Sequence, residues 1–187
     1  MSNSRLPAVT TAALLLSVAI AACGGRDVEP GAQPSGLILS DADVSSIFAN
    51  ANAEEIQTAN LALTRSSNTA VREFAQRMIT DHTRVNQQLE MIMRNRNMQT
   101  RSNTVTQQQQ SRSSQAMQSL QQLQGADFDR AYIADQVAIH QWLLQTIDQV
   151  LIPSARDRDL ERLLTETRPT IASHLEQARQ IQNSLGR

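Results

Sequence analysis

Hydrophobic residues recur at steps of three and four along most of the chain after residue 40. One series places a histidine among apolar residues: Val71, Phe74 or Ala75, Met78, His82, Val85, Leu89 and Ile92. A second series does the same: Ile133, Val137, His140, Leu144, Ile147 and Leu151. Such steps place side chains on one face of an α-helix. They predict helices over about 68–96 and 128–152, and an all-α protein.

Capping signals predict where the helices begin. Ser40 and Asp43 form a capping-box pattern, which predicts a helix over about 41–66. Asn68 and Asp127 are suited to cap the next two long helices. The residues Ser154 to Asp157 form another capping-box pattern, which predicts a last helix that ends near Leu185.

The last helix has its own series of mostly apolar positions on one face, which we call its seam, and it contains a proline. The seam residues are Leu160, Leu164, Thr167, Ile171, His174, Ala178, Ile181 and Leu185. Pro169 lies inside this helix and lacks a backbone donor, so we expect it to kink or split the helix. Pro153 is expected to end the helix before it.

The segment between the second and third long helices is polar and low in complexity. Residues 97–114 are expected to form a long connection or a weak helix start, followed by a short helix over Ser114–Gln124. Four long helices with two short turns and one longer connection predict a ferritin-like four-helix bundle with a crossover over 40–185. An up-down-up-down meander is the topological alternative.

Composition excludes several functional classes. The 187 residues carry 17 basic and 18 acidic side chains, so there is no basic excess of the kind that nucleic-acid binding requires. Aromatic residues make up only 3%, which argues against a β-sandwich. The sequence contains no Gly-rich phosphate loop, no G-x-S-x-G elbow and no H-E-x-x-H motif. No reaction is therefore indicated, and a non-enzymatic role is favoured.

The first segment, 1–22, has the features of an export signal. Arg5 precedes an uncharged, mostly apolar run over 8–22, which is short for a membrane span and suited to a signal peptide. The run ends in Ile20-Ala21-Ala22-Cys23, which resembles the bacterial lipobox. This resemblance implies cleavage before Cys23, the only cysteine, and lipidation of its thiol. A plain signal peptide with an incidental cysteine is the alternative.

The residues after the cysteine bear on location. Gly24 follows Cys23, and by resemblance to lipoprotein sorting in Gram-negative bacteria this favours the periplasmic face of the outer membrane. Residues 23–39 are rich in Gly, Pro and polar residues, so we expect a flexible tether between the lipid anchor and the bundle.

The three histidines of the chain, His82, His140 and His174, each fall on the seam of a different predicted helix. Together with Glu55 in the middle of the first helix they could hold a single Zn, Fe or Cu ion in the bundle core. Glu55 and His82 would differ in height by about 4 Å, but His140 and His174 by about 10 Å, which counts against one compact site.

Other interpretations of the histidines remain open. Glu-x-x-His is absent, which argues against a ferritin-type di-iron centre. Each histidine could instead be a buried core residue bonded to a carboxylate, a backbone carbonyl or water, or could sense pH. Asp81 and Asp135 are near in sequence but do not face the same way as His82 and His140.

Three stretches resemble the bacterial domain-of-unknown-function family 4142: VREFAQRMITDHTRVNQQLE (71–90), GADFDRAYIADQVAIHQ (125–141) and PTIASHLEQA (169–178). The resemblance implies a ferritin-like helical bundle and an exported or outer-membrane-associated protein, with no established activity. The matching positions are Glu55, Val71, Arg72, Phe74, Ala75, Met78, Asp81, His82, Phe128, Asp129, Tyr132, His140, Pro169 and His174. Two departures are Asn52, where glycine is common, and the Gln-rich segment 107–115.

The matching polar residues can also be structural. We expect Arg72 and Asp129 to make interhelical ion pairs and Tyr132 to bond one of the histidines. The sequence is then consistent with two alternative functions. One is a lipid-anchored, non-enzymatic bundle that acts through a protein partner in envelope maintenance or stress. The other is a metal-binding bundle that uses Glu55 and the three histidines.

Overall fold

The computed structural model describes residues 39–186, which are helical with no strand in that range. The elements are α1 (Asp41–Arg65), α2 (Thr69–Asn95), α3 (Thr104–Gln121), α4 (Gly125–Thr146), the π-helical turn η1 (Ile147–Leu151), α5 (Ile152–Ser154) and α6 (Arg158–Leu185). The all-α prediction is confirmed. The predicted signal peptide, Cys23 and all of the tether before Leu39 lie outside the described residues.

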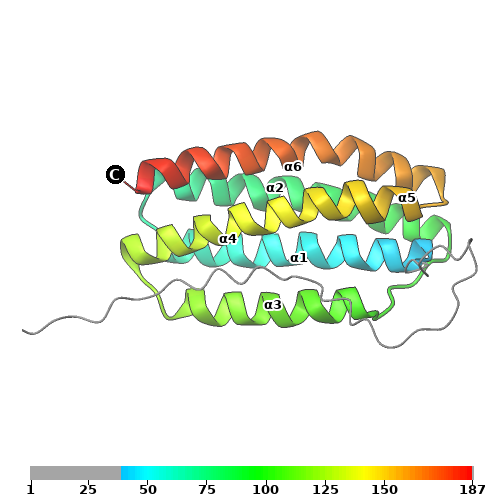
Figure 1. Ribbon diagram of the computed structural model, residues 1–187, viewed down its shortest axis with the longest axis horizontal. Helices are drawn as coiled ribbons and strands as arrows, with labels where there is room; N and C mark the ends of the chain where they lie inside the picture. Colours follow the sequence, from blue (N-terminus) through cyan, green and yellow to red (C-terminus); the bar gives the residue numbers. More distant parts are fainter. Residues whose placement is uncertain (1–38, 187) are drawn as a thin grey trace, which may run out of the picture. The chain divides into compact units, whose positions relative to one another are not determined.

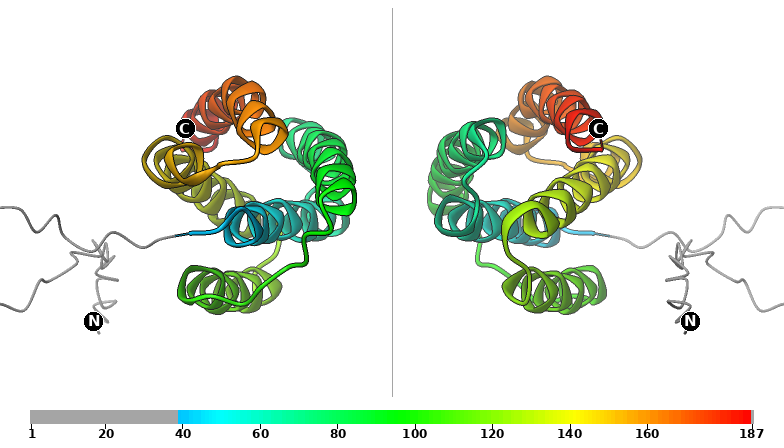
Figure 2. Two further views of the ribbon diagram at one scale, coloured as in Figure 1. Left: turned by 90° about the vertical axis from the view of Figure 1, so that its right-hand side faces the viewer. Right: turned by 90° about the vertical axis from the view of Figure 1, so that its left-hand side faces the viewer.

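Four helices form the bundle, and α3 lies outside it. Helix α1 packs on α2 and α4, and α6 packs on α4 and α2, so that each bundle helix has two neighbours. Figure 1 shows that these neighbours run antiparallel, whereas the diagonal helices α2 and α4 run in the same direction. The connection from α2 to α4 therefore crosses the length of the bundle as α3 (Figure 1). The end-on views of Figure 2 show α3 outside the four bundle helices, beside α1. The crossover topology is confirmed, and the meander is excluded.

Helix α3 is longer than the sequence pattern predicts. The Gln-rich segment is helical from Thr104, because Asn103 caps it and exchanges bonds with Thr106 in a capping box. Glutamine is a good helix former. The helix is attached to α1 by polar contacts as well as by Leu120, since Gln109 donates to the carbonyl of Ile47. An apolar stripe does not mark such a helix, and of the two alternatives for 97–114, a long connection or a weak helix start, the structure shows the helix start at Thr104.

Two of the four predicted caps are confirmed. Ser40 and Asp43 form the capping box of α1, and Asn68 accepts from the backbone of Val71 at the start of α2. Asp127 does not cap α4, which begins earlier, at Gly125, with a φ of +54° that glycine tolerates. The cap of α6 is Asp157 rather than Ser154.

The two prolines differ in effect: the helix ends one residue after Pro153, close to the predicted end, whereas Pro169 does not split α6. The helical path continues past Pro153 to Ser154, through the π-helical turn η1. Pro169 lies inside α6, which is not split. Pro169 and Thr165 are exposed, so water can reach the carbonyl of Thr165 that the missing N–H leaves unpaired.

The turn before α6 lies later in the chain than expected, and this changes the expected difference in height between His140 and His174. The turn lies between Ser154 and Arg158, so His140 stands about 15 residues before it and His174 about 17 after it. The two histidines then differ in height by about 3 Å rather than about 10 Å.

The core has a polar layer between two apolar clusters. One cluster contains Ala51, Val85, Leu143 and Ile171, towards one end of the bundle. The other contains apolar residues from the same four helices towards the other end: Ala59, Ala62, Val71, Phe74, Met78, Phe128, Tyr132, Ile133, Ala178 and Ile181. The buried polar residues between them are Asn52, Glu55, His82, Gln136, His140 and His174. No helix among the described residues is long and apolar enough to cross a membrane.

Candidate metal centre

Three helices of the bundle bring the three histidines of the chain together in the polar layer. His82 lies on α2, His140 on α4 and His174 on α6, and their side chains are buried, with exposed fractions of 2% or less. One ring nitrogen from each lies within 4.8 Å of the other two. The ring centroids are 5.5 to 5.9 Å apart. The structure therefore places three potential nitrogen ligands around one point.

Each imidazole has one hydrogen-bonded nitrogen and one without a partner. Nδ1 of His82 lies 2.8 Å from Oδ1 of Asn52, and Nδ1 of His140 lies 2.8 Å from the carbonyl of Gln136. Nε2 of His174 lies 2.9 Å from a carboxylate oxygen of Asp81. A carbonyl or carboxylate oxygen only accepts, so these three nitrogens carry the protons. The remaining nitrogens, Nε2 of His82, Nε2 of His140 and Nδ1 of His174, have no partner.

The surroundings keep the imidazoles neutral. Burial, with the neighbouring His174, lowers the pKa of His140 to about 3. Burial and the two neighbouring rings lower the pKa of His82 well below its ordinary value. Burial also lowers the pKa of His174, although the hydrogen bond that His174 donates to Asp81 acts in the opposite direction. A neutral imidazole keeps the lone pair that a metal ion needs.

Each ring has one hydrogen-bond acceptor, which we call its outer partner, and the bonded nitrogen is its outer nitrogen. Metal-binding histidines in proteins usually have such partners. Here the outer partners are a side-chain amide oxygen, a backbone carbonyl and a carboxylate, one for each histidine. Such partners fix the tautomer and the orientation of a metal-binding imidazole. Asn52 was not identified as a site residue from the sequence. Its spacing of three from Glu55 and seven from the buried Ala59, on one face of α1, was the available signal.

Glu55 is close to the histidines but is not grouped with them. Its Oε1 lies 3.5 Å from Nδ1 of His140, which is the nitrogen already bonded to the carbonyl of Gln136. The side chain is fully buried, and neither of its oxygens has a hydrogen-bond partner. Burial, together with the nearby Asp135 carboxylate, raises the pKa of Glu55 well above its ordinary value. The group of converging ligands contains the histidines only.

Asp81 and Arg72, which were expected to have structural roles, make different kinds of contact. Asp81 bonds His174 across the α2–α6 interface and also pairs with Arg84. Arg72 donates to the carbonyls of Leu63 and Ser66 at the end of α1. Its expected interhelical ion pair was therefore wrong: the guanidinium satisfies carbonyls that a helix end leaves free.

Asp129 and Tyr132 do not make their expected contacts either. Asp129 is buried and forms no ion pair with the described cations, and its Oδ1 has no partner. The hydroxyl of Tyr132 also lacks a partner, so the expected bond to a histidine is absent from the described contacts. The Tyr132 ring stacks on Phe128 and meets Phe74 edge-on, and Phe74 in turn contacts His140. Tyr132 thus supports the histidines through aromatic packing.

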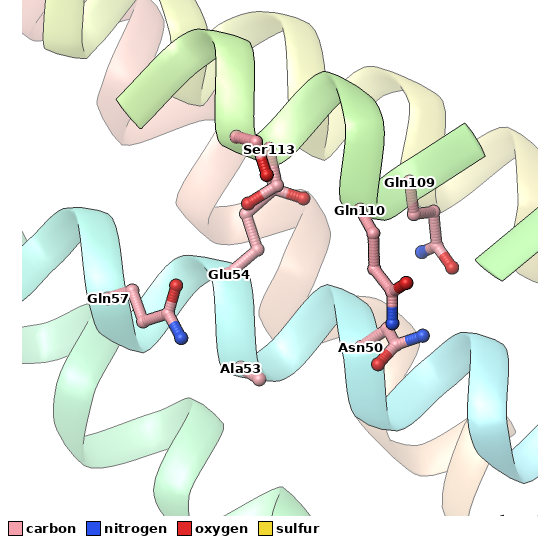
Figure 3. Close-up of a pocket in the computed structure, with 8 residues that line it drawn as sticks. Asn50, Ala53, Glu54, Gln57, Gln109, Gln110 and Ser113 are labelled. Carbon is pink, nitrogen blue, oxygen red and sulfur yellow. The ribbon is translucent and has the colours of Figure 1, made fainter. Parts of the chain in front are cut away.

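A second polar cluster links α3 to the bundle. Arg112 on α3 contacts the carboxylates of Glu54 on α1 and Asp135 on α4. Burial raises the pKa of Glu54 to about 7, although Arg112 opposes the shift. A groove of about 220 Å³ lies between α1 and α3. Figure 3 shows Glu54 beside Ser113 among the residues that line it. The groove is lined mainly by amide and hydroxyl side chains, and none of the histidines lines it.

Two solved structures share the fold. One is a DUF305 protein of Streptomyces coelicolor, described as secreted, with a TM-score of 0.66 and 11% identity, over 79% of this chain and 96% of that one. The other is CopM in its Cu(II)-bound form, with a TM-score of 0.61 and 14% identity, over 79% of this chain and 99% of that one. At these identities the likeness shows the fold alone. No curated protein matches the chain.

The sequence itself matches a family over most of its length. The match covers residues 27–181, and within the described part it spans all four bundle helices and the three histidines. The chain therefore belongs to the family described as Domain of unknown function (DUF4142).

Proposed function

We propose that this protein binds a single transition-metal ion through His82, His140 and His174. The observation that carries the proposal is the convergence of three imidazoles whose outer nitrogens are bonded and whose other nitrogens have no partner. Buried polar atoms in proteins are almost always paired, so the unpaired nitrogen on each of three neighbouring rings calls for a ligand. Imidazole suits zinc, copper, iron and nickel.

Copper is the best supported of these metals. CopM, which has a similar fold, is described in a Cu(II)-bound form. The rings are 2% exposed or less, and the grooves between α1 and α3 and along the start of α6 are lined by other residues. Within residues 39–186 neither of these two grooves is lined by the histidines, so the proposed role is to hold the metal rather than to catalyse a reaction on it.

The proposed location is the periplasmic face of the outer membrane, with a lipid anchor on Cys23. It is supported by the lipobox-like sequence and by the secreted description of the DUF305 neighbour. Incorporation of radiolabelled palmitate, lost in a Cys23→Ser variant, is expected. Incorporation that persists in this variant contradicts the lipid anchor.

Metal analysis of the protein, purified without a histidine tag, tests the main proposal. We expect one copper, zinc or iron ion per chain after loading and removal of excess metal, and less than about a tenth of that in a His140→Gln variant. Tyr132→Phe is the matched control, because it alters a buried neighbour of the site without removing a ligand. Protein that binds no metal, and whose melting temperature ignores added metal, contradicts the proposal.

A further inference from the structure

We propose that the three-histidine site selects copper in its univalent state, Cu(I), over Cu(II) and Zn(II). This inference rests on the proposed metal-binding function and assigns the ion that the site takes. It follows from the number of donors, their charge and the burial of the histidines between the two apolar clusters of the core.

The donor set is small and uniform. Among the described residues, the converging group consists of three imidazole nitrogens, with no carboxylate and no thiolate. Zinc in structural sites is almost always four-coordinate, and Cu(II) prefers a square or tetragonal arrangement of nitrogen and oxygen ligands. Cu(I) and Zn(II) both have a filled d shell, so they differ here in coordination number: Cu(I) accepts three nitrogen donors alone, whereas Zn(II) on three histidines takes a water molecule as its fourth ligand. The set is complete for Cu(I) and incomplete for the two divalent ions.

The histidines are shielded from solvent, so a further ligand from water would have to enter the buried core. All three rings are 2% exposed or less, and the apolar clusters of the core lie on both sides of them along the bundle. The edge of Phe74 packs against His140, with a centroid distance of 6.3 Å. A water molecule that completed the coordination of Zn(II) would have to enter this buried layer, where, besides the histidine nitrogens, the polar atoms without a partner belong to Asn52, Glu55 and Gln136.

The charge of the site also favours a univalent ion. The cost of moving an ion from water into a low-dielectric core rises with the square of its charge, so a divalent ion costs roughly four times as much. The ligands offer no negative charge in return. The carboxylate behind His174 is already shared, because Oδ1 of Asp81 lies 3.0 Å from Arg84. Glu55 faces the outer nitrogen of His140 rather than the centre of the group.

Competition binding tests the selectivity. The protein is titrated anaerobically with Cu(I) against bicinchoninate, and with Cu(II) and Zn(II) against chromophoric chelators at the same pH and ionic strength. We expect the Kd for Cu(I) to lie at least about tenfold below both other values, which corresponds to about 1.4 kcal/mol. A smaller difference, or the reverse order, overturns the selectivity but leaves the metal site standing. Absence of stoichiometric binding by all three ions overturns the proposed function itself.

Two further measurements test the physical reasons. X-ray absorption of the Cu(I)-loaded protein is expected to show a first shell of three nitrogens, and an added oxygen or sulfur ligand overturns the three-donor assignment. A Glu55→Gln variant keeps the shape of the side chain and removes the nearby carboxyl group. We expect its Kd for Cu(I) to change by less than about threefold. A loss of about tenfold or more shows that the ion relies on this carboxylate and contradicts the neutral site.

Discussion

A carboxylate oxygen of Asp81 on α2 lies 2.9 Å from Nε2 of His174 on α6. This contact joins two neighbouring helices and holds the proton of His174 on Nε2, which leaves Nδ1 unprotonated and without a partner. Asp81 is the most exposed of the three outer partners, since its side chain is 22% exposed. It is therefore a suitable position at which to change the support of the site without altering a ligand.

An Asp81→Ala variant should bind metal about ten- to a hundredfold more weakly, as is usual when the outer partner of a ligating histidine is lost. The imidazole of His174 would then be free to change its tautomer and orientation. Competition titration measures the change in Kd. Arg84→Gln is the matched control, because it removes the surface partner of Asp81 and leaves the bond to His174 in place. Equal losses in the two variants would show that surface charge, rather than ring orientation, controls affinity.

Metal affinity should change little between about pH 7.5 and pH 5.5. Burial lowers the pKa of all three histidines, that of His140 to about 3, so protons do not compete for the lone pairs in this range. Three exposed histidines with ordinary pKa values near 6.5 would lose up to about a thousandfold at pH 5.5. We expect a loss below about tenfold, measured by titration at each pH. A loss close to a thousandfold would place the bound metal on accessible, protonatable rings.

The metal-free protein should gain stability relative to a Glu55→Gln variant as the pH falls. The pKa of Glu55 is raised in the folded state, so the carboxyl group contributes stability below its unfolded pKa and loses it as the pH rises towards the folded value. The difference in unfolding free energy should change by about 1.4 kcal/mol per pH unit above about pH 4.5.

Urea unfolding at about pH 5 and pH 7 measures this difference. Tyr132→Phe serves as the control, because burial raises the pKa of Tyr132 well above 10 and the phenol stays neutral over this range. Its effect on stability should not depend on pH. A pH-independent difference for Glu55→Gln as well would mean that Glu55 titrates alike in the folded and unfolded chains.

The four bundle helices could be predicted from the sequence because their seams are strongly periodic. In α2, Val71, Phe74, Met78, His82, Val85 and Leu89 are all buried as expected. The periodic pattern does not show polar contacts between helices, which is why the first part of α3 was left open between a connection and a weak helix start. In α4, the seam was displaced at Val137 and Leu144, which are half-buried, whereas Gln136 and Leu143 are buried. Because Gln136 is polar, a seam chosen from apolar residues alone does not include it.

The sequence was enough to assign the three histidines to the core. It was not enough to predict that their rings meet at one height. Their relative heights depend on where the turn between α4 and α6 lies, and Pro153 suggested a position too early in the chain. A shift of a few residues at a helix end moves a side chain by several ångströms. The direction in which a glutamate points cannot be read from spacing either. Glu55 lies behind His140 instead of joining the ligand group.

Helix α3 should loosen from the bundle when Arg112 is replaced by Gln. Arg112 is the only described cation in contact with Glu54 and Asp135, and the side chain of Glu54 is 4% exposed. Removing it leaves buried carboxylates without a partner. The cost should be about 1–2 kcal/mol, less than for a fully buried pair, because Arg112 itself is 40% exposed. Hydrogen exchange is expected to accelerate over Thr104–Gln121 and to stay unchanged in α2 and α6.

The pH dependence of this effect follows from Glu54. Its pKa is raised to about 7, so at about pH 5.5 the carboxyl group is mostly protonated in the folded chain and depends less on the guanidinium. The exchange of α3 in Arg112→Gln should therefore be faster relative to the unsubstituted protein at about pH 8 than at about pH 5.5. Arg130→Gln is the matched control, since Arg130 pairs only with the exposed Asp127 among the described residues. If α3 exchanged at the same rate in both variants at pH 8, its attachment would depend on Leu120 and the amide contacts instead of on the buried charges.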